Sequence, residues 1–261
     1  MNTSSPWLAL VALDQPALPE ADELIGAFAA RFPDEPPLAI ASQTDRSLTL
    51  TLGGDTSTTV NLTLVEKAIP WERLEGPCAT AWYWPGAEDA LRHHTDHLFV
   101  TLIDERGKPI ERCTRLTRLV SAVVDATPAV GVVWGASGAV HEPAPFAELA
   151  AKSSPDDLPL HLWIDFRVYE HDPSNPRGEG FGMFTTGLEA LGYPEFEVPH
   201  FAGDPQRLVG AVYNVTHYLL EKGAQLKDSE GIGLPDGSQV TARESPSEID
   251  PGQEVIRLEF E

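Results

Sequence analysis

A group of histidines at residues 93–97 has the spacing closest to a metal site in this sequence. His93 and His97 are four residues apart, which would place two imidazoles on one face of a helix, as in H-E-x-x-H zinc sites. The motif's Glu is missing, and the predicted helix ends at His94, with Asp96 following. Two interpretations remain open: a metal site on His93 and His97, or cations that interact favourably with a helix C-terminus.

The sequence Gly-Ala-Ser-Gly-Ala at 135–139 is close to the G-x-S-x-G nucleophile elbow of hydrolases. Its last position is Ala139 rather than glycine. The elbow also needs a helix directly after Ser137, which Pro143 and Pro145 obstruct. We therefore predict a hairpin turn here.

Several carboxylates lie two residues from another polar side chain in predicted strands. Asp165 shares a predicted strand face with Arg167. If that face is exposed, the two form a surface ion pair. If a helix covers it, they form a buried pair and a candidate site. We expect the surface or interface position. Glu195 and Glu197 also share a face, a spacing too common to identify an acid/base pair.

Two tryptophans, Trp82 and Trp84, lie in a Pro-flanked segment and either cover the core or form an exposed anchor for a partner protein. The candidate binding residues are Trp82, Trp84, Asp165, Glu195 and Glu197. The Gly231-Ile232-Gly233 segment lacks the third glycine of a phosphate-binding fingerprint, and no cofactor is predicted. Arg112, Arg115 and Arg118 are predicted to form a solvated helix face.

Residues 159–198 are predicted to form the centre of a sheet. Every second residue from Leu160 to Val168 is apolar, which is typical of a strand with one buried face. Two further apolar runs, 181–186 and 193–198, predict an antiparallel set of three strands.

The fold class predicted for the whole chain is α+β, with mostly antiparallel sheets and helices packed on one face. Residues 1–110 predict the order β-α-β-β-β-α-β, close to a ferredoxin-like β-α-β-β-α-β unit with an added strand. Residues 111–261 predict a second α+β half, with helices at 112–126 and 205–221. The pattern is compatible with two halves or with one continuous domain.

The chain is strongly acidic, with a net charge of −22 over 261 residues. Residues 1–120 carry 17 acidic and 10 basic side chains, and residues 121–261 carry 23 and 8. This negative potential disfavours binding to nucleic acid or anionic membranes. It can speed association with a basic protein partner, or serve solubility alone, or reflect a salt-rich habitat. Two cysteines do not predict a disulfide framework, and no apolar run approaches the ~20 residues of a membrane span. The expected compartment is cytoplasmic.

Several segments resemble the bacterial domain-of-unknown-function family forty-two sixty-one, DUF4261. The resemblance spans about residues 60–260 and is strongest in 159–260. Its most specific stretch is Phe184-Thr185-Thr186-Gly187-Leu188 through Gly192-Tyr193-Pro194-Glu195-Phe196-Glu197-Val198. The resemblance implies a folded bacterial protein and identifies no catalytic residue.

The function expected from these observations is a non-enzymatic acidic binding protein. Its surface would dock a basic partner protein such as a toxin, as an immunity-type protein does. The alternative is a small metal-assisted enzyme with its site near His93, His94 and His97.

Overall fold

The structure, a computed structural model, describes residues 7–172, 174, 176–235 and 237–260. The chain divides into two compact units, Met1–Ser153 and Ser154–Glu261. The expected division after residue 110 is therefore not the one observed. The α+β class is confirmed, with helices and mostly antiparallel strands in both units.

The N-terminal unit contains a seven-stranded sheet in the order β2-β3-β4-β5-β1-β6-β7. Its elements in chain order are β1 (Trp7–Leu13), α1 (Ala21–Arg31), β2 (Leu38–Gln43), β3 (Ser47–Leu52), β4 (Asp55–Val65), the 3₁₀ turn η1 (Trp71–Arg73), α2 (Glu75–Thr80), α3 (Ala87–Arg92), β5 (Asp96–Asp104), α4 (Pro109–Asp125), β6 (Ala129–Trp134), β7 (Val140–His141) and α5 (Pro143–Lys152).

The middle of this sheet has ferredoxin-like connections. β1 pairs antiparallel with β5 and with β6, so β5 and β6 run parallel on either side of β1 and are joined by α4. β1 and β4 likewise run parallel on either side of β5. These are two interlocked split β-α-β units. The β5-α4-β6 unit needs β6 and nearly all of α4, which lie beyond residue 110, and this explains why the chain does not divide there.

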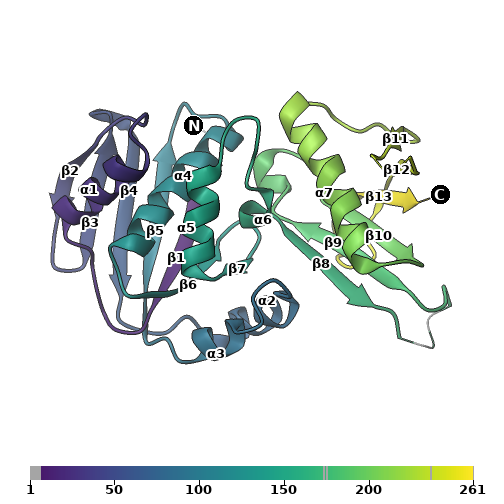
Figure 1. The fold of residues 1–261 in the computed structure, drawn as a ribbon, viewed down its shortest axis with the longest axis horizontal. Coiled ribbons are helices and arrows are strands. Elements are labelled where there is room, and N and C mark those ends of the chain that lie inside the picture. Colours follow the sequence, from purple (N-terminus) through teal and green to yellow (C-terminus); the bar gives the residue numbers. More distant parts are fainter. Residues whose placement is uncertain (1–6, 173, 175, 236, 261) are drawn as a thin grey trace. The chain divides into compact units, whose positions relative to one another are not determined.

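Helices cover both faces of this sheet. α1, α4 and α5 lie over one face (Figure 1), where α4 contacts β1 and β5. A second apolar cluster packs Trp84 and Leu91 against Ala12 and Val133. Because strand side chains alternate between faces, Ala12 points away from its buried neighbour Val11 and towards the second cluster. The prediction of helices on one face is therefore incomplete.

The C-terminal unit contains a six-stranded sheet in the order β11-β12-β13-β10-β9-β8. Its elements in chain order are α6 (Leu160–Trp163), β8 (Asp165–Glu170), β9 (Phe181–Thr186), the 3₁₀ turn η2 (Glu189–Leu191), β10 (Phe196–Phe201), α7 (Pro205–Lys222), β11 (Gly231–Gly233), β12 (Gln239–Pro246) and β13 (Glu254–Phe260).

One long helix, α7, lies across this second sheet (Figure 1). Asp204 caps the helix by accepting a hydrogen bond from Gln206 N at 2.9 Å, with Pro205 in the first turn. Gly223 ends it in a left-handed conformation, with φ 61°. β10 and β13 pair in parallel, whereas the other pairings of this sheet are antiparallel.

The strand predicted to begin near Leu160 begins at Asp165 instead. Residues Leu160–Trp163 form one helical turn, closed by a hydrogen bond from Ile164 N to Leu160 O at 2.8 Å. The turn buries Leu160, Leu162 and Trp163. An apolar side chain at every second position therefore does not distinguish a buried turn from a buried strand over so few residues.

Candidate functional site

A cavity of about 430 Å³ opens in the C-terminal unit. We call it the Glu244–Glu254 pocket. It is lined by Gly192, Tyr193, Pro194, Phe196, Leu219, Gln225, Leu226, Glu244, Glu254, Val255 and Ile256. These residues come from the loop before β10, the end of α7 and the segment after it, and the paired strands β12 and β13. A concave, largely apolar cavity with a few polar groups is the usual form of a binding site.

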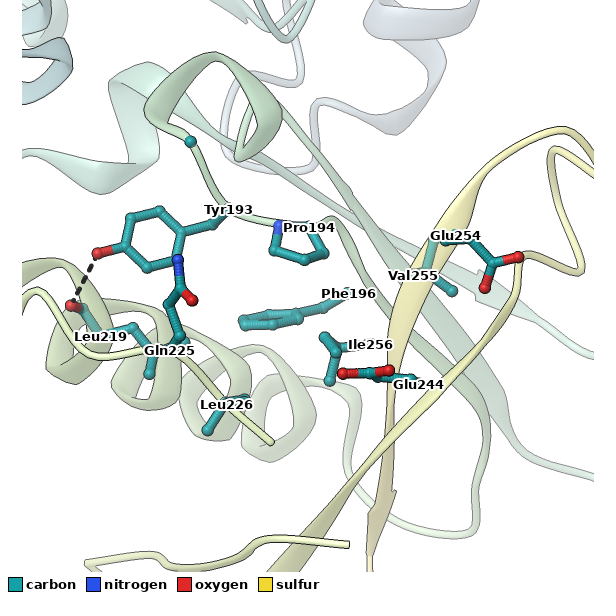
Figure 2. A pocket seen from close by; sticks show the side chains of 11 residues that line it. Tyr193, Pro194, Phe196, Leu219, Gln225, Leu226, Glu244, Glu254, Val255 and Ile256 are labelled. Atoms are coloured by element: carbon teal, nitrogen blue, oxygen red, sulfur yellow. Dashed lines mark hydrogen bonds between the residues drawn. The ribbon is translucent and has the colours of Figure 1, made fainter. Parts of the chain in front are cut away.

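The floor of the Glu244–Glu254 pocket is apolar. The parallel pairing of β10 with β13 sets Phe196 opposite Ile256, and α7 supplies Leu219. All three side chains are buried. Figure 2 shows the Phe196 ring in the middle of the pocket, with Leu226 on one side and Ile256 on the other. These side chains close the bottom of the pocket, and the apolar surface left to a bound group comes from half-buried Tyr193 and Leu226 and exposed Pro194.

Two polar side chains border the pocket on the α7 side. Tyr193 follows Gly192, which ends η2 with φ 88°. Glycine adopts this left-handed conformation readily. The Tyr193 hydroxyl donates a hydrogen bond to Leu219 O at 3.3 Å, near the end of α7 (Figure 2). Gln225 adds an amide beside the Tyr193 ring (Figure 2).

Two carboxylates, Glu244 and Glu254, border the opposite side. Glu244 pairs with Ile256 across the β12–β13 ladder, and Glu254 lies two residues before Ile256, so both carboxylates share the pocket face. Arg243 and Arg257 lie on the other face, where they form ion pairs with Glu259 and Glu248. Among the described residues, neither Glu244 nor Glu254 is part of an ion pair.

Glu195, a predicted binding residue, is buried and holds a turn instead. Its carboxylate accepts hydrogen bonds from Thr185 Oγ1 at 2.7 Å, Gly187 N at 2.7 Å and Glu189 N at 3.1 Å. Burial raises the pKa of Glu195, and these donors partly oppose that rise. The side chain fixes the turn from β9 to η2 and is not available to a partner.

Glu197 is also buried and anchors a second loop. Its carboxylate accepts hydrogen bonds from the Ser247 hydroxyl and, at 3.0 Å, from Glu248 N. The Ser247 hydroxyl oxygen in turn accepts from Asp250 N at 2.8 Å. Glu195 and Glu197 therefore organise the loops around β10, and neither lines the Glu244–Glu254 pocket.

Asp165 is buried rather than on the surface, contrary to the expected position. It is 4% exposed and accepts a hydrogen bond from Arg167 Nε at 2.6 Å. Burial raises the pKa of Asp165, and the Arg167 guanidinium counteracts this rise. The pair lies at the start of β8 and does not line the Glu244–Glu254 pocket.

His93 and His97 do not share a helix face. α3 ends at Arg92, and His97 belongs to β5. His93 Nδ1 lies 2.7 Å from Asp89 O, and His97 Nδ1 lies 2.7 Å from Lys67 O. Burial lowers the pKa of His97. Both rings are thus engaged with backbone carbonyls.

The other members of this group, His94 and Asp96, are also engaged in hydrogen bonds. His94 Nε2 accepts a hydrogen bond from Ile69 N at 2.7 Å, and the Thr95 hydroxyl donates to Asp96. These contacts fix the turn between α3 and β5. Across the described residues, no three His, Cys, Asp or Glu side chains gather so that they could hold a metal ion.

The two tryptophans have different environments. Trp84 is 7% exposed and belongs to the apolar cluster with Leu91. Trp82 is 59% exposed, with its ring edge-on to Tyr83 at 5.7 Å. An exposed anchor is therefore consistent with Trp82 and not with Trp84.

Two pocket carboxylates were not predicted, although the sequence carries a signal for them. On β12 the apolar face of Val240 and Ala242 continues into Glu244, and on β13 the face of Leu258 and Ile256 continues into Glu254. A carboxylate that extends the inward face of a strand must reach solvent or a ligand. Two such positions at the same end of neighbouring strands indicate a polar opening.

Among the helices of the described residues, none has both the length and the apolar run needed to cross a membrane. No curated protein and no solved structure matches the chain. One family model matches, over a range that begins after β8 and includes every residue of the Glu244–Glu254 pocket. Residues 184–259 match the model of DUF4261, a domain of unknown function, which confirms the resemblance over this part of the chain.

Proposed function

We propose that this protein is a non-enzymatic binding protein that docks a basic partner protein on its C-terminal unit, as an immunity-type protein docks a toxin. The observation that carries the proposal is the Glu244–Glu254 pocket. It sets two carboxylates beside an apolar floor that includes Phe196 and Ile256.

The chemistry of the pocket fits a lysine or arginine side chain of the partner. Such a side chain has an apolar stem and a charged end, and it buries the stem while the charge stays at a polar edge. The stem would lie against Tyr193 and Leu226 above the apolar floor, and the cation would reach Glu244 and Glu254. Because Glu244 and Glu254 are exposed, each ion pair with the cation would contribute about 0.2–1 kcal/mol.

The charge of the C-terminal unit supports the same class of partner. Residues 154–261 carry 20 Asp and Glu side chains against 7 Lys and Arg. A field of this sign accelerates association with a basic protein and weakens as salt is added. It repels the phosphates of nucleic acids.

Replacing both pocket carboxylates by amides should weaken binding to a basic probe. The probe is a capped oligolysine peptide at low ionic strength, and the variant is Glu244→Gln with Glu254→Gln. We expect roughly tenfold weaker binding, because two cation–carboxylate contacts are lost. Isothermal titration calorimetry measures the affinity.

A matched control changes the charge by the same amount elsewhere on the unit. Glu170 and Glu179 are exposed and do not line the pocket. The variant Glu170→Gln with Glu179→Gln should bind the peptide nearly as tightly as the original protein. Equal loss in the two double variants would show a general charge effect and contradict the pocket's role, and no binding by the original protein would remove the proposal altogether.

A further inference from the structure

β11 is the edge strand of the six-stranded sheet and, among the described strands, pairs with β12 alone. Hydrogen bonds link every second residue of an antiparallel pair. Ala242 N donates to Glu230 O and Leu234 N donates to Ser238 O, both at 2.9 Å. The even-numbered residues in and beside β11 therefore form the main-chain hydrogen bonds to β12. The N–H and C=O groups of Gly231 and Gly233 point away from β12, towards the free edge.

The two residues of β11 whose main-chain groups face the free edge are both glycines, which carry no side chain to shield it. Gly231 and Gly233 are exposed, and a Cβ atom at either position would meet no atom within 4 Å. Natural sheet edges are usually protected by charged side chains, proline or a bulge. A glycine in a strand often marks a place where another backbone approaches closely.

A groove runs between this edge and α7. It is a second cavity, of about 480 Å³, and we call it the β11 groove. The strand side is formed by β11 and the residues after it, and the helix side includes Asn214, His217, Tyr218 and Glu221. Tyr218 is 52% exposed. Leu226 lines both the β11 groove and the Glu244–Glu254 pocket, so the two cavities are neighbours.

An edge strand that faces a helix across a groove suits an extended peptide. The strand supplies main-chain hydrogen bonds, and the helix contacts alternate side chains. The charges at the groove fit a basic peptide: Glu230 and Glu221 line it, and none of the described residues that line it is Lys or Arg. Glu221 also pairs with Lys222, which does not line the groove, and lies 3.8 Å from His217.

We propose that the β11 groove receives an extended basic segment of the partner protein, which adds to β11 as a further strand. This rests on the proposed function, because the segment belongs to the same partner whose basic side chain enters the Glu244–Glu254 pocket. The Leu226 boundary places the two contacts side by side. Gly231 and Gly233 supply the main-chain donors and acceptors of the added strand.

The test uses a short capped peptide of alternating lysine and valine, with a glutamate–valine peptide as the charge control. Nuclear magnetic resonance follows amide exchange in the full chain. The lysine peptide should slow exchange of the Gly231 and Gly233 amides at least tenfold, and the glutamate peptide should not. Unchanged exchange at saturating lysine peptide would overturn the inference.

A proline substitution tests the same edge by affinity. Gly233→Pro removes the outward N–H without removing a β12 hydrogen bond, and Gly233→Ala keeps that N–H in open space. We expect the proline variant to bind the lysine peptide roughly tenfold more weakly than the alanine variant. Equal affinities would contradict strand addition.

The two proposals fail in different ways. Binding that depends on Glu244 and Glu254 but leaves the Gly231 and Gly233 amides unprotected would reject strand addition and retain the proposed function. Protection of the amides without any dependence on the two carboxylates would reject the role of the pocket and retain strand addition. Absence of binding by the original protein would reject both.

Discussion

Replacing Glu195 by alanine should destabilise the C-terminal unit by about 3 kcal/mol or more. The substitution removes the acceptor for three buried or partly buried donors: the Thr185 hydroxyl and the amides of Gly187 and Glu189. A buried donor left without a partner costs about 1–3 kcal/mol, and more when the lost acceptor is charged. The expected result is a lower denaturant midpoint for this unit.

A glutamine at the same position is the matched control. Its carbonyl oxygen can accept from Gly187 and Glu189, as Glu195 Oε1 does. Glu195→Gln should therefore cost about 1 kcal/mol, well below the alanine variant. Hydrogen exchange resolved along the chain separates the two units. An alanine variant no less stable than the glutamine variant would contradict the role of this carboxylate as the anchor of the turn.

Replacing Asp104 by alanine should destabilise the N-terminal unit by about 3 kcal/mol. Asp104 ends β5, and its side chain is 1% exposed. It accepts hydrogen bonds from Arg106 N at 3.1 Å and Gly107 N at 2.8 Å, and it pairs with Arg115 on α4. Removing one partner of such a pair leaves the other charge and the amides uncompensated.

The same carboxyl predicts a pH dependence. Burial alone would raise the pKa of Asp104, but the amides of Gly107 and Arg106 and the Arg115 guanidinium together hold it below its ordinary value. The folded state therefore binds this proton less readily than the unfolded state. The resulting stability is complete above about pH 4 and is lost as the pH falls through the folded pKa.

Denaturant unfolding at pH 7 and at steps down to about pH 2 checks this dependence. The stability difference between the original protein and Asp104→Ala should shrink over the acid range. Asp104→Asn keeps the size of the side chain and one oxygen acceptor, so it should lie between the two at pH 7. A difference that is the same at every pH would contradict the proposed ionisation.

Much of the fold could be predicted because helices and strands have characteristic spacings of apolar side chains within short segments. α4 and α7 have apolar side chains at helical spacing, and α7 also has the Asp204 cap and the Gly223 end. β3 and β4 alternate between apolar and hydroxyl side chains. The sequence predicts a strand where α6 lies, because this single turn buries Leu160 and Leu162, which are two residues apart as on one face of a strand.

The site could not be predicted in the same way because distant segments form it. Tyr193, Leu219, Glu244 and Ile256 meet only through the parallel pairing of β10 with β13 and the packing of α7. Residue type also did not reveal burial. The sequence predicts that Glu195 binds a partner. In the structure its carboxylate instead accepts hydrogen bonds from the amides of Gly187 and Glu189.

The position of β1 has a consequence for synthesis of the chain. It is the first strand of the described residues, yet it lies inside the seven-stranded sheet between β5 and β6. Neither neighbour exists until residues 96–104 and 129–134 have been made. An apolar strand thus leaves the ribosome long before it can pair, and contacts so distant in sequence form slowly. We expect newly made N-terminal segments to depend on chaperone binding until β6 emerges.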